Sequence, residues 1–188
     1  MDYSELLIKR RAIRDYKDQP VPLNILKEII KESTLAPSSG NVQPWKFVIV
    51  NNKEKMKSIS DESKKNLVDR LDENPKEYYW RYADMLRDKD YNVFYNAPAL
   101  IFITGKRKYK RLTGDCSLCA AYMMNASVVR GLGTCWINFG SDIRDPELLK
   151  ELGITDEIEI IAPIIIGYPK NIPGATERKE PEILAIIN

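Results

Sequence analysis

The strongest constraint on the fold is an apolar run near the C-terminal end of the sequence. Residues 159–166 read EIIAPIII and are followed by Gly167, so almost every side chain in the run is apolar. A strand that is apolar on both faces is typical of a sheet covered on both sides. The run therefore predicts a buried strand that other elements must cover.

The rest of the chain supplies those elements, because strand patterns and helix patterns interleave along it without repeats. Short β-branched or apolar runs predict strands over residues 46–50, 99–104 and 134–138. Helical spacing and breakers predict helices over residues 23–33, 115–130 and 146–152. A few strands among more numerous helices favour an α+β sandwich, and 188 residues fit a single domain spanning the whole chain.

Two segments stand apart from this pattern. Residues 53–92 form a variable insert, rich in Lys, Asp and Glu, that predicts two solvated helices broken near Pro75. Its interleaved aromatics, Tyr78 to Tyr82, can belong to a solvated face, a substrate pocket or a dimer surface. The tail, residues 169–188, contains three prolines and a glycine and is expected to be extended up to about Glu182, as an arm that packs on another subunit.

Composition limits the partners. The 29 basic and 27 acidic residues leave a net charge of +2, which indicates neither a nucleic-acid nor a membrane partner, so a small molecule is expected. No apolar run approaches the roughly 20 residues that span a membrane. Met1 to Arg14 is too charged for a signal peptide, and an odd count of 3 cysteines argues against a disulfide framework. We therefore expect a cytoplasmic protein.

The sequence contains no histidine. This excludes Ser-His triads and zinc sites that need histidine, so chemistry must come from carboxylates, thiols, lysines or a borrowed cofactor. Cys116 and Cys119 have CxxC spacing, but they fall inside a predicted helix and are expected to be core residues. No metal site is expected.

The first candidate binding motif is a cluster of Arg10, Arg11 and Arg14 near the end of the first amphipathic segment. If that segment is helical, the three guanidinium groups lie within one and a half turns and converge. Arginine matches phosphate geometry bidentately, so the cluster can bind a phosphate. Solvation, or pairing with Asp15 and Asp18, is the alternative.

The second motif is the loop of residues 36–45, APSSGNVQPW. Small polar side chains at Ser38, Ser39 and Asn41 can bond to a planar heterocycle or a ribityl chain, while prolines fix the shape of the loop. The alternative is an ordinary turn with Trp45 in the core.

Together with the turn GLGTCW at residues 131–136, these two motifs resemble the nitroreductase family. The resemblance covers nearly the whole chain apart from residues 53–92. It implies an α/β/α sandwich with a mainly antiparallel central sheet. It also implies a homodimer with one FMN at each end of the interface and a C-terminal arm swapped onto the partner subunit.

The resemblance also implies a set of cofactor-binding residues. The phosphate, ribityl chain and pyrimidine edge of FMN are expected at Arg10, Arg11, Ala12 and Arg14, where the family often has Ser in place of Ala12. The partner subunit is expected to contribute Pro37, Ser38, Ser39 and Asn41. One flavin face is expected along Trp136, Ile137, Asn138 and Phe139, where a backbone N–H can reach N5. A basic residue of the arm, Arg178 or Lys179, is expected at the phosphate.

The reaction implied is hydride transfer from NADH or NADPH to the flavin and on to a nitroaromatic, a quinone or a similar electron-poor acceptor, in a ping-pong scheme. No catalytic side chain is required, because the flavin carries the redox chemistry. Two alternatives stay open. One is a flavin enzyme of this fold with other chemistry, such as reductive dehalogenation or azoline oxidation; the other is a flavin-binding module without turnover.

Overall fold

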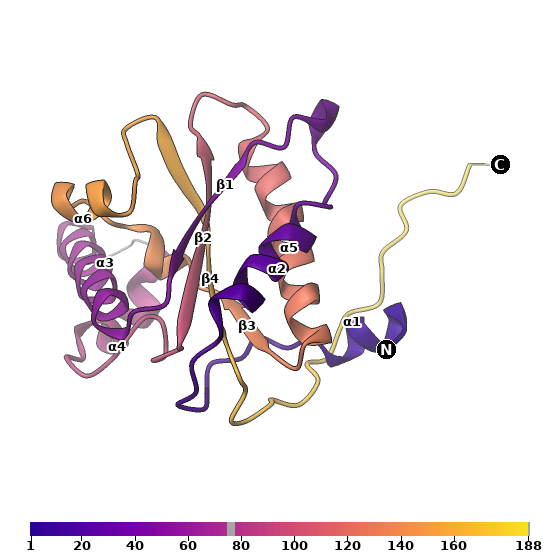
Figure 1. Ribbon diagram of the computed structural model, residues 1–188, viewed down its shortest axis with the longest axis horizontal. Coiled ribbons are helices and arrows are strands. Elements are labelled where there is room, and N and C mark those ends of the chain that lie inside the picture. The colour runs from indigo at the N-terminus through magenta and orange to yellow at the C-terminus, as the bar shows by residue number, and fades with distance from the viewer. Residues whose placement is uncertain (75–77, 188) are drawn as a thin grey trace.

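The computed structural model describes residues 1–74 and 78–187 of the chain. A four-stranded sheet lies between two layers of helices in this part of the chain (Figure 1). The strands are β1 (Trp45–Val50), β2 (Ala99–Lys106), β3 (Gly133–Trp136) and β4 (Ile158–Gly167), in the order β1-β2-β4-β3. All three strand pairings are antiparallel. The α+β sandwich with an antiparallel sheet is therefore confirmed.

The apolar run at residues 159–166 forms most of β4, between β2 and β3. Its alternate side chains belong to two separate cores: Ala162, Ile164 and Ile166 pack on one face, and Ile165 packs on the other. Since both faces are buried, neither can carry polar residues, which explains the lack of alternation in the sequence.

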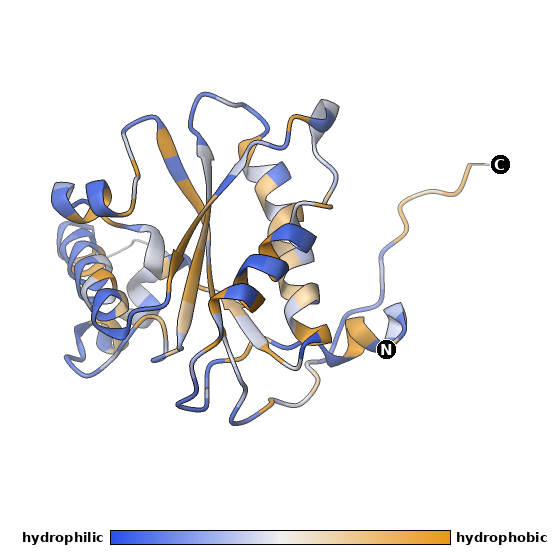
Figure 2. Cartoon of the chain, viewed as in Figure 1, coloured by the Kyte–Doolittle hydropathy of each residue, from blue (hydrophilic) through white to orange (hydrophobic). Residues whose placement is uncertain are grey.

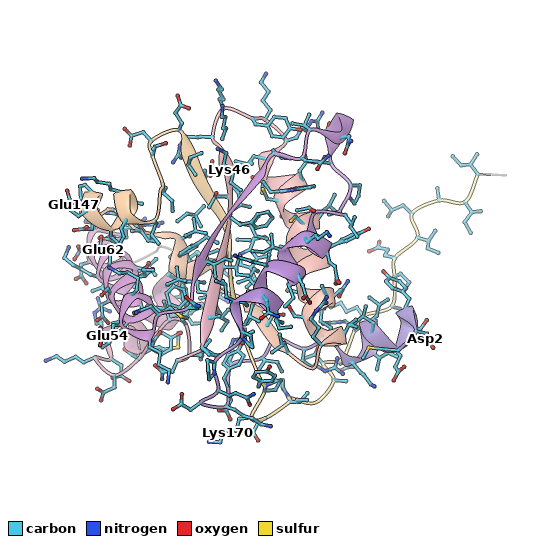
Figure 3. The ribbon with its side chains drawn as sticks, in the orientation of Figure 1. Asp2, Lys46, Glu54, Glu62, Glu147 and Lys170 are labelled. Atoms are coloured by element: carbon cyan, nitrogen blue, oxygen red, sulfur yellow. The ribbon has the colours of Figure 1, made fainter. Side chains whose placement is uncertain are left out.

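A helical layer covers each face of the sheet. One layer contains α2 (Leu23–Ser33) and α5 (Leu112–Val129), and the other contains α3 (Lys53–Glu73), α4 (Ala83–Arg87) and α6 (Pro146–Glu151). Figure 2 shows apolar residues concentrated on the strands between the layers. Charged side chains such as Glu54 and Glu147 lie on the outside of the second layer (Figure 3). Among the described residues, no helix is long and apolar enough to cross a membrane.

The charged insert is only partly solvated. One side of α3 is buried, with Met56, Ile59 and Leu67 at 2% exposure or less. A 3-10 helix, η2 (Tyr78–Tyr82), and α4 follow it, and the expected break near Pro75 lies outside the described residues. The expectation of two solvated helices is therefore right for the exposed side of α3 and wrong for its buried side, where the apolar residues among the charges cover the sheet.

The end of β3 and the course of the C-terminal arm also differ from the sequence prediction. β3 ends at Trp136 rather than at Asn138, because the chain turns into the 3-10 helix η3 (Asn138–Ser141). The arm after β4 stays extended past Glu182 and projects from the body of the molecule (Figure 1). Its apolar side chains have no cover within one chain: Leu184 is 90% exposed and Ile187 is 94% exposed.

Candidate active site

The arginine cluster lies on an extended segment beside β3. Helix α1 (Tyr3–Lys9) ends before the first arginine, and Arg10 has extended backbone angles, φ −62° and ψ 128°. The N–H of Ile13 donates to the carbonyl of Thr134 at 3.0 Å, next to a bridge between Ala12 and Thr134. The expected helical arrangement of the three arginines is therefore wrong: backbone pairing with β3 replaces the helix.

This geometry separates Arg11 from the other two arginines. Its Nη1 donates to the carbonyl of Arg10 at 2.8 Å and also to the carbonyl of Ile8. Successive side chains of an extended segment point to opposite sides, so Arg10 and Arg14 share a side and Arg11 does not. Two of the three guanidinium groups, those of Arg10 and Arg14, therefore lie on the same side of the segment.

Arg10 and Arg14 both act on the thiol of Cys135 in β3. Burial raises the pKa of this thiol, and the positive charges of Arg14 and Arg10 act in the opposite direction. The guanidinium carbon of Arg14 also lies over the ring of Tyr95, 5.7 Å from its centroid. The two arginines therefore supply positive charge beside the end of β3.

Neither carboxylate that could neutralise these arginines pairs with them. Asp15 accepts a hydrogen bond from Asn171, and Asp18 forms an ion pair with Lys53. In the described part of the chain, Arg10 and Arg14 form no ion pair with any carboxylate. The pairing alternative is thus not observed, and both guanidinium groups keep donors for an anion.

A cavity of about 410 Å³ opens beside Arg14. It brings together the expected flavin-face residues and the aromatic residues of the insert. Its lining consists of Arg14, Tyr78, Tyr79, Tyr82, Met85, Tyr95, Trp136, Ile137, Asn138 and Phe139. Residues 78–82 and 136–139 lie about 60 residues apart in the sequence. In the structure both segments line one cavity together with Arg14 of the N-terminal segment.

Aromatic edges form one wall of this cavity. The ring of Phe139 in η3 contacts Tyr79 and Tyr82 of η2 edge to face, with centroid distances of 5.5 Å and 5.2 Å. Such pairs add about 0.5–1.5 kcal/mol beyond the apolar area that they bury. Of the three interpretations of the tyrosine segment, lining a pocket is the one that the geometry favours.

Two buried polar atoms at β3 lack partners. Among the described residues, the indole Nε1 of Trp136 and the Oγ1 of Thr134 have no hydrogen-bond partner. A buried donor without an acceptor costs roughly 1–3 kcal/mol. One of these two residues, Trp136, also lines the cavity.

The second sequence motif lies far from the first within one chain. The turn that contains Ser38 and η1 (Ser39–Asn41) sits at the start of α5, where the Ser39 N–H donates to Asp115 at 3.2 Å. α5 has 18 residues, which at 1.5 Å per residue is about 27 Å, and the chain reaches β3 only at its far end. Figure 1 shows this turn and α1 near opposite ends of α5. One chain therefore brings Arg14 and residues 136–139 together but leaves residues 37–41 apart.

The remaining predicted residues have simple placements. Trp45 is 8% exposed and belongs to the core, as the ordinary-turn interpretation expected. Arg178 and Lys179 lie in the exposed arm and do not line the cavity. Whether either of them binds a phosphate stays a prediction.

The cysteines are structural. Cys116, Cys119 and Cys135 are free and buried, and the described residues contain no cluster that could hold a metal ion. Burial raises the pKa of Cys116 to about 12 and that of Cys119 to about 11, so both thiols are neutral at physiological pH.

Sequence reasoning missed Asp115 and Tyr109. Asp115 is 6% exposed and accepts hydrogen bonds from Ser39 and from the Tyr109 hydroxyl. One signal was available, because Asp115 is the only charged residue between Leu112 and Val129. A lone carboxylate in an apolar helix needs hydrogen-bond partners.

Comparison with known proteins identifies the family of the chain. Residues 7–168 match the profile of the Nitroreductase family. A protein of Archaeoglobus fulgidus, provisionally named an NADH dehydrogenase/NAD(P)H nitroreductase, is 27% identical over 173 residues, which cover 89% of this chain and 85% of that protein. The iodotyrosine deiodinase of Thermotoga neapolitana is 28% identical over 185 residues, which cover 94% of this chain and 93% of that enzyme.

The fold has close counterparts among solved structures. A nitroreductase with bound FMN from Bacteroides fragilis has a TM-score of 0.84 at 23% identity, over 99% of this chain and 100% of that one. Since the family profile covers most of the sequence and the architecture agrees over the full chain, this protein belongs to the nitroreductase family and is an oxidoreductase of that family.

Proposed function

We propose that two copies of this chain bind FMN between them and transfer hydride from NADH or NADPH to a small, electron-poor aromatic or quinone acceptor. The single observation that carries this proposal is the cavity in which Arg14, the end of β3 and the aromatic wall of η2 meet. The B. fragilis nitroreductase, which shares the fold, binds FMN.

The residues present fit a phosphorylated flavin. Arg10 and Arg14 have no carboxylate partner in the described residues and offer charged donors of the kind that bind phosphate and other anionic groups. The cavity of about 410 Å³ is lined largely by flat or apolar side chains, as suits an aromatic ring system. Ala12 supplies no side-chain donor, but one neutral hydrogen bond contributes only about 0.5–1.5 kcal/mol, less than the charged contacts.

We assign the roles as follows. FMN, when bound, supplies the redox chemistry, accepting hydride from the nicotinamide and delivering it to the acceptor. Arg10 and Arg14 bind its anionic groups and stabilise negative charge on its ring. Trp136 to Phe139 support one face of the ring, and Tyr79 and Tyr82 limit the space for the acceptor. The reductant leaves before the acceptor enters, which is a ping-pong order.

A homodimer completes the site. Because α5 holds residues 37–41 about 27 Å from the β3 end, these residues can reach a flavin only from a second subunit. Exposed apolar side chains support a second subunit here: Leu118, Tyr122 and Val129 of α5 are 42–59% exposed. The arm adds Ile183, Leu184 and Ile187, which we propose cover the partner and bring Arg178 or Lys179 to its phosphate. The free, buried cysteines support a location in the reducing cytoplasm.

The decisive experiment is reconstitution. Purified protein with added FMN should give a perturbed flavin spectrum and oxidise NADH or NADPH with a nitroarene or a quinone. Arg14→Ala should weaken FMN binding more than tenfold, or about 1.4 kcal/mol, while Arg107→Ala, an exposed arginine remote from the cavity, should not. A wild-type protein that neither binds FMN nor oxidises NAD(P)H would refute the proposal.

A second candidate is reductive removal of halogen from an aromatic ring. It is supported by the similarity to the Thermotoga neapolitana deiodinase and by the aromatic wall at Tyr79 and Tyr82. Nitro and halogenated aromatics should therefore be compared directly. NAD(P)H oxidation that depends on the halogenated compound would favour this candidate, and rapid mixing without reoxidation by any acceptor would indicate a binding module.

A further inference from the structure

Asp115 is a buried carboxylate whose two oxygens serve different donors. Its Oδ1 accepts the backbone N–H of Ser39 at 3.2 Å, and its Oδ2 accepts the hydroxyl of Tyr109 at 2.9 Å. The residue is 6% exposed and, in the described part of the chain, forms no ion pair. Burying a carboxylate without a cation is costly, although its place in the first turn of α5 offsets part of that cost.

The turn that Asp115 contacts is strained. Gly40, Asn41 and Gln43 all have left-handed backbone angles, with φ of 57°, 55° and 49°. Left-handed angles at residues other than glycine cost of order 1–3 kcal/mol and persist when surrounding contacts fix them. Such a turn needs anchoring to keep one conformation.

Asp115 anchors the turn from outside it. Most side-chain hydrogen bonds of the turn are internal: Gln43 N–H donates to Ser38 Oγ, and Gln43 Nε2 donates to Asn41 Oδ1, both at 3.0 Å. Within the described residues, the turn is tied to the rest of the chain at Ser39, whose N–H donates to Asp115 and whose side chain interacts with Tyr109.

Tyr109 donates a hydrogen bond to the second oxygen of Asp115 and so supports its contact with Ser39. Partial burial, followed by its hydrogen bond to Asp115, raises the pKa of Tyr109, whereas the Ser39 side chain acts in the opposite direction. The phenol therefore stays protonated and can donate to Asp115. Since Ser39 and Tyr109 both contact the same carboxylate, the three residues form one unit.

We infer that Asp115 is a positioning residue for cofactor binding, which holds Ser38 to Asn41 in the conformation that meets the flavin of the partner subunit. The inference rests on the proposed function, because it takes the contact between this turn and FMN from there. Asp115 acts through Ser39 and does not itself touch the cofactor.

The test is FMN affinity in matched variants of the full chain, measured by quenching of flavin fluorescence. Asp115→Ala should raise the Kd for FMN at least tenfold and speed amide exchange of residues 38–43. Asp115→Asn keeps an acceptor oxygen for Ser39 and should leave the Kd for FMN close to that of wild type, below that of Tyr109→Phe. Tyr109→Phe should give an intermediate increase of about threefold.

Asp145→Ala is the control for a general loss of stability. Asp145 likewise accepts one backbone N–H, from Leu148 at 2.7 Å, but in the opposite helical layer. This variant should keep the wild-type Kd. Equal weakening by Asp145→Ala, or no rescue by Asp115→Asn, would overturn the inference.

The outcomes also separate this inference from the proposed function. Wild-type protein that does not bind FMN refutes the function, whereas wild-type protein that binds FMN together with an Asp115→Ala variant of equal affinity refutes only the positioning role. If Asp115→Ala fails to fold, Tyr109→Phe decides: an increased Kd supports the unit of three residues, and a wild-type Kd overturns it.

Discussion

Gly133 of β3 faces the side chain of Ile13 so closely that a Cβ on Gly133 would lie 2.4 Å from Ile13 Cγ1. This approach brings the segment from Arg10 to Arg14 against β3 and sets the position of its guanidinium groups. Glycine at position 133 therefore allows the arginine segment to lie against β3.

Gly133→Ala should accordingly destabilise the protein and weaken FMN binding. The added methyl group must displace a buried Ile13, and overpacking of this kind typically costs 1–3 kcal/mol. Urea unfolding measures the loss. Gly114→Ala is the control, because nothing lies within 4 Å of its Cβ position and alanine favours a helix, so it should be neutral or stabilising. An unchanged stability of Gly133→Ala would contradict the role of this contact.

Tyr82→Ala should raise the KM for aromatic acceptors by up to about tenfold, because it removes one edge-to-face contact with Phe139 from the cavity wall. The reductive half of the reaction, measured as flavin bleaching by NAD(P)H, should be little changed. Ferricyanide serves as an acceptor that needs no aromatic wall. An equal loss with ferricyanide would show that Tyr82 acts on the flavin instead.

Removal of residues 177–188 should shift the protein from dimer to monomer and weaken FMN binding more than tenfold. The fold of each subunit should survive, since the described apolar side chains lost, Ile183, Leu184, Ile186 and Ile187, are 69–94% exposed within one chain. Sedimentation velocity and far-UV circular dichroism measure the two effects. The full-length double variant Arg178→Ala/Lys179→Ala should stay dimeric and lose only affinity. A truncated protein that remains a dimer with full affinity would refute the proposed role of the arm.

The stability of the protein should fall at high pH because of two buried thiols. The pKa of Cys116 is raised from 9.0 to about 12 and that of Cys119 from 9.0 to about 11. A raised folded-state pKa gives a contribution that is complete below pH 9, declines above it and is fully lost once the pH has passed 11 and 12. The free energy of unfolding in urea should therefore fall less steeply between pH 8 and pH 10.5 in Cys116→Ala/Cys119→Ala. Parallel curves for the variant and the wild type would contradict this.

The layers of the fold could be predicted because their signals are local. The all-apolar run of β4 and the helical spacing of α2 each reflect burial in the finished sandwich, so they remain visible in a single sequence. The extended course of the arm up to Glu182 was predictable for the same kind of reason, since prolines disfavour a helix, whereas its extension past Glu182 was not.

The arginine segment could not be placed from its own spacing. Its departure from helix depends on pairing between Ile13 and Thr134, residues about 120 positions apart. The sequence left the role of η2 open among three alternatives, because the aromatic partner of Tyr79 and Tyr82 is Phe139, in another element. Contacts between residues so far apart leave no periodic pattern in the sequence, so they could not be predicted from it.

The length of α5 has a consequence for genetics as well as for structure. If each flavin takes its arginines from one subunit and its serine-containing turn from the other, mixing Arg14→Ala subunits with Ser39→Ala subunits produces heterodimers with one undamaged site and one doubly damaged site. Two alleles that each damage a different half of the site would then complement each other, which a site contained within a single chain does not allow.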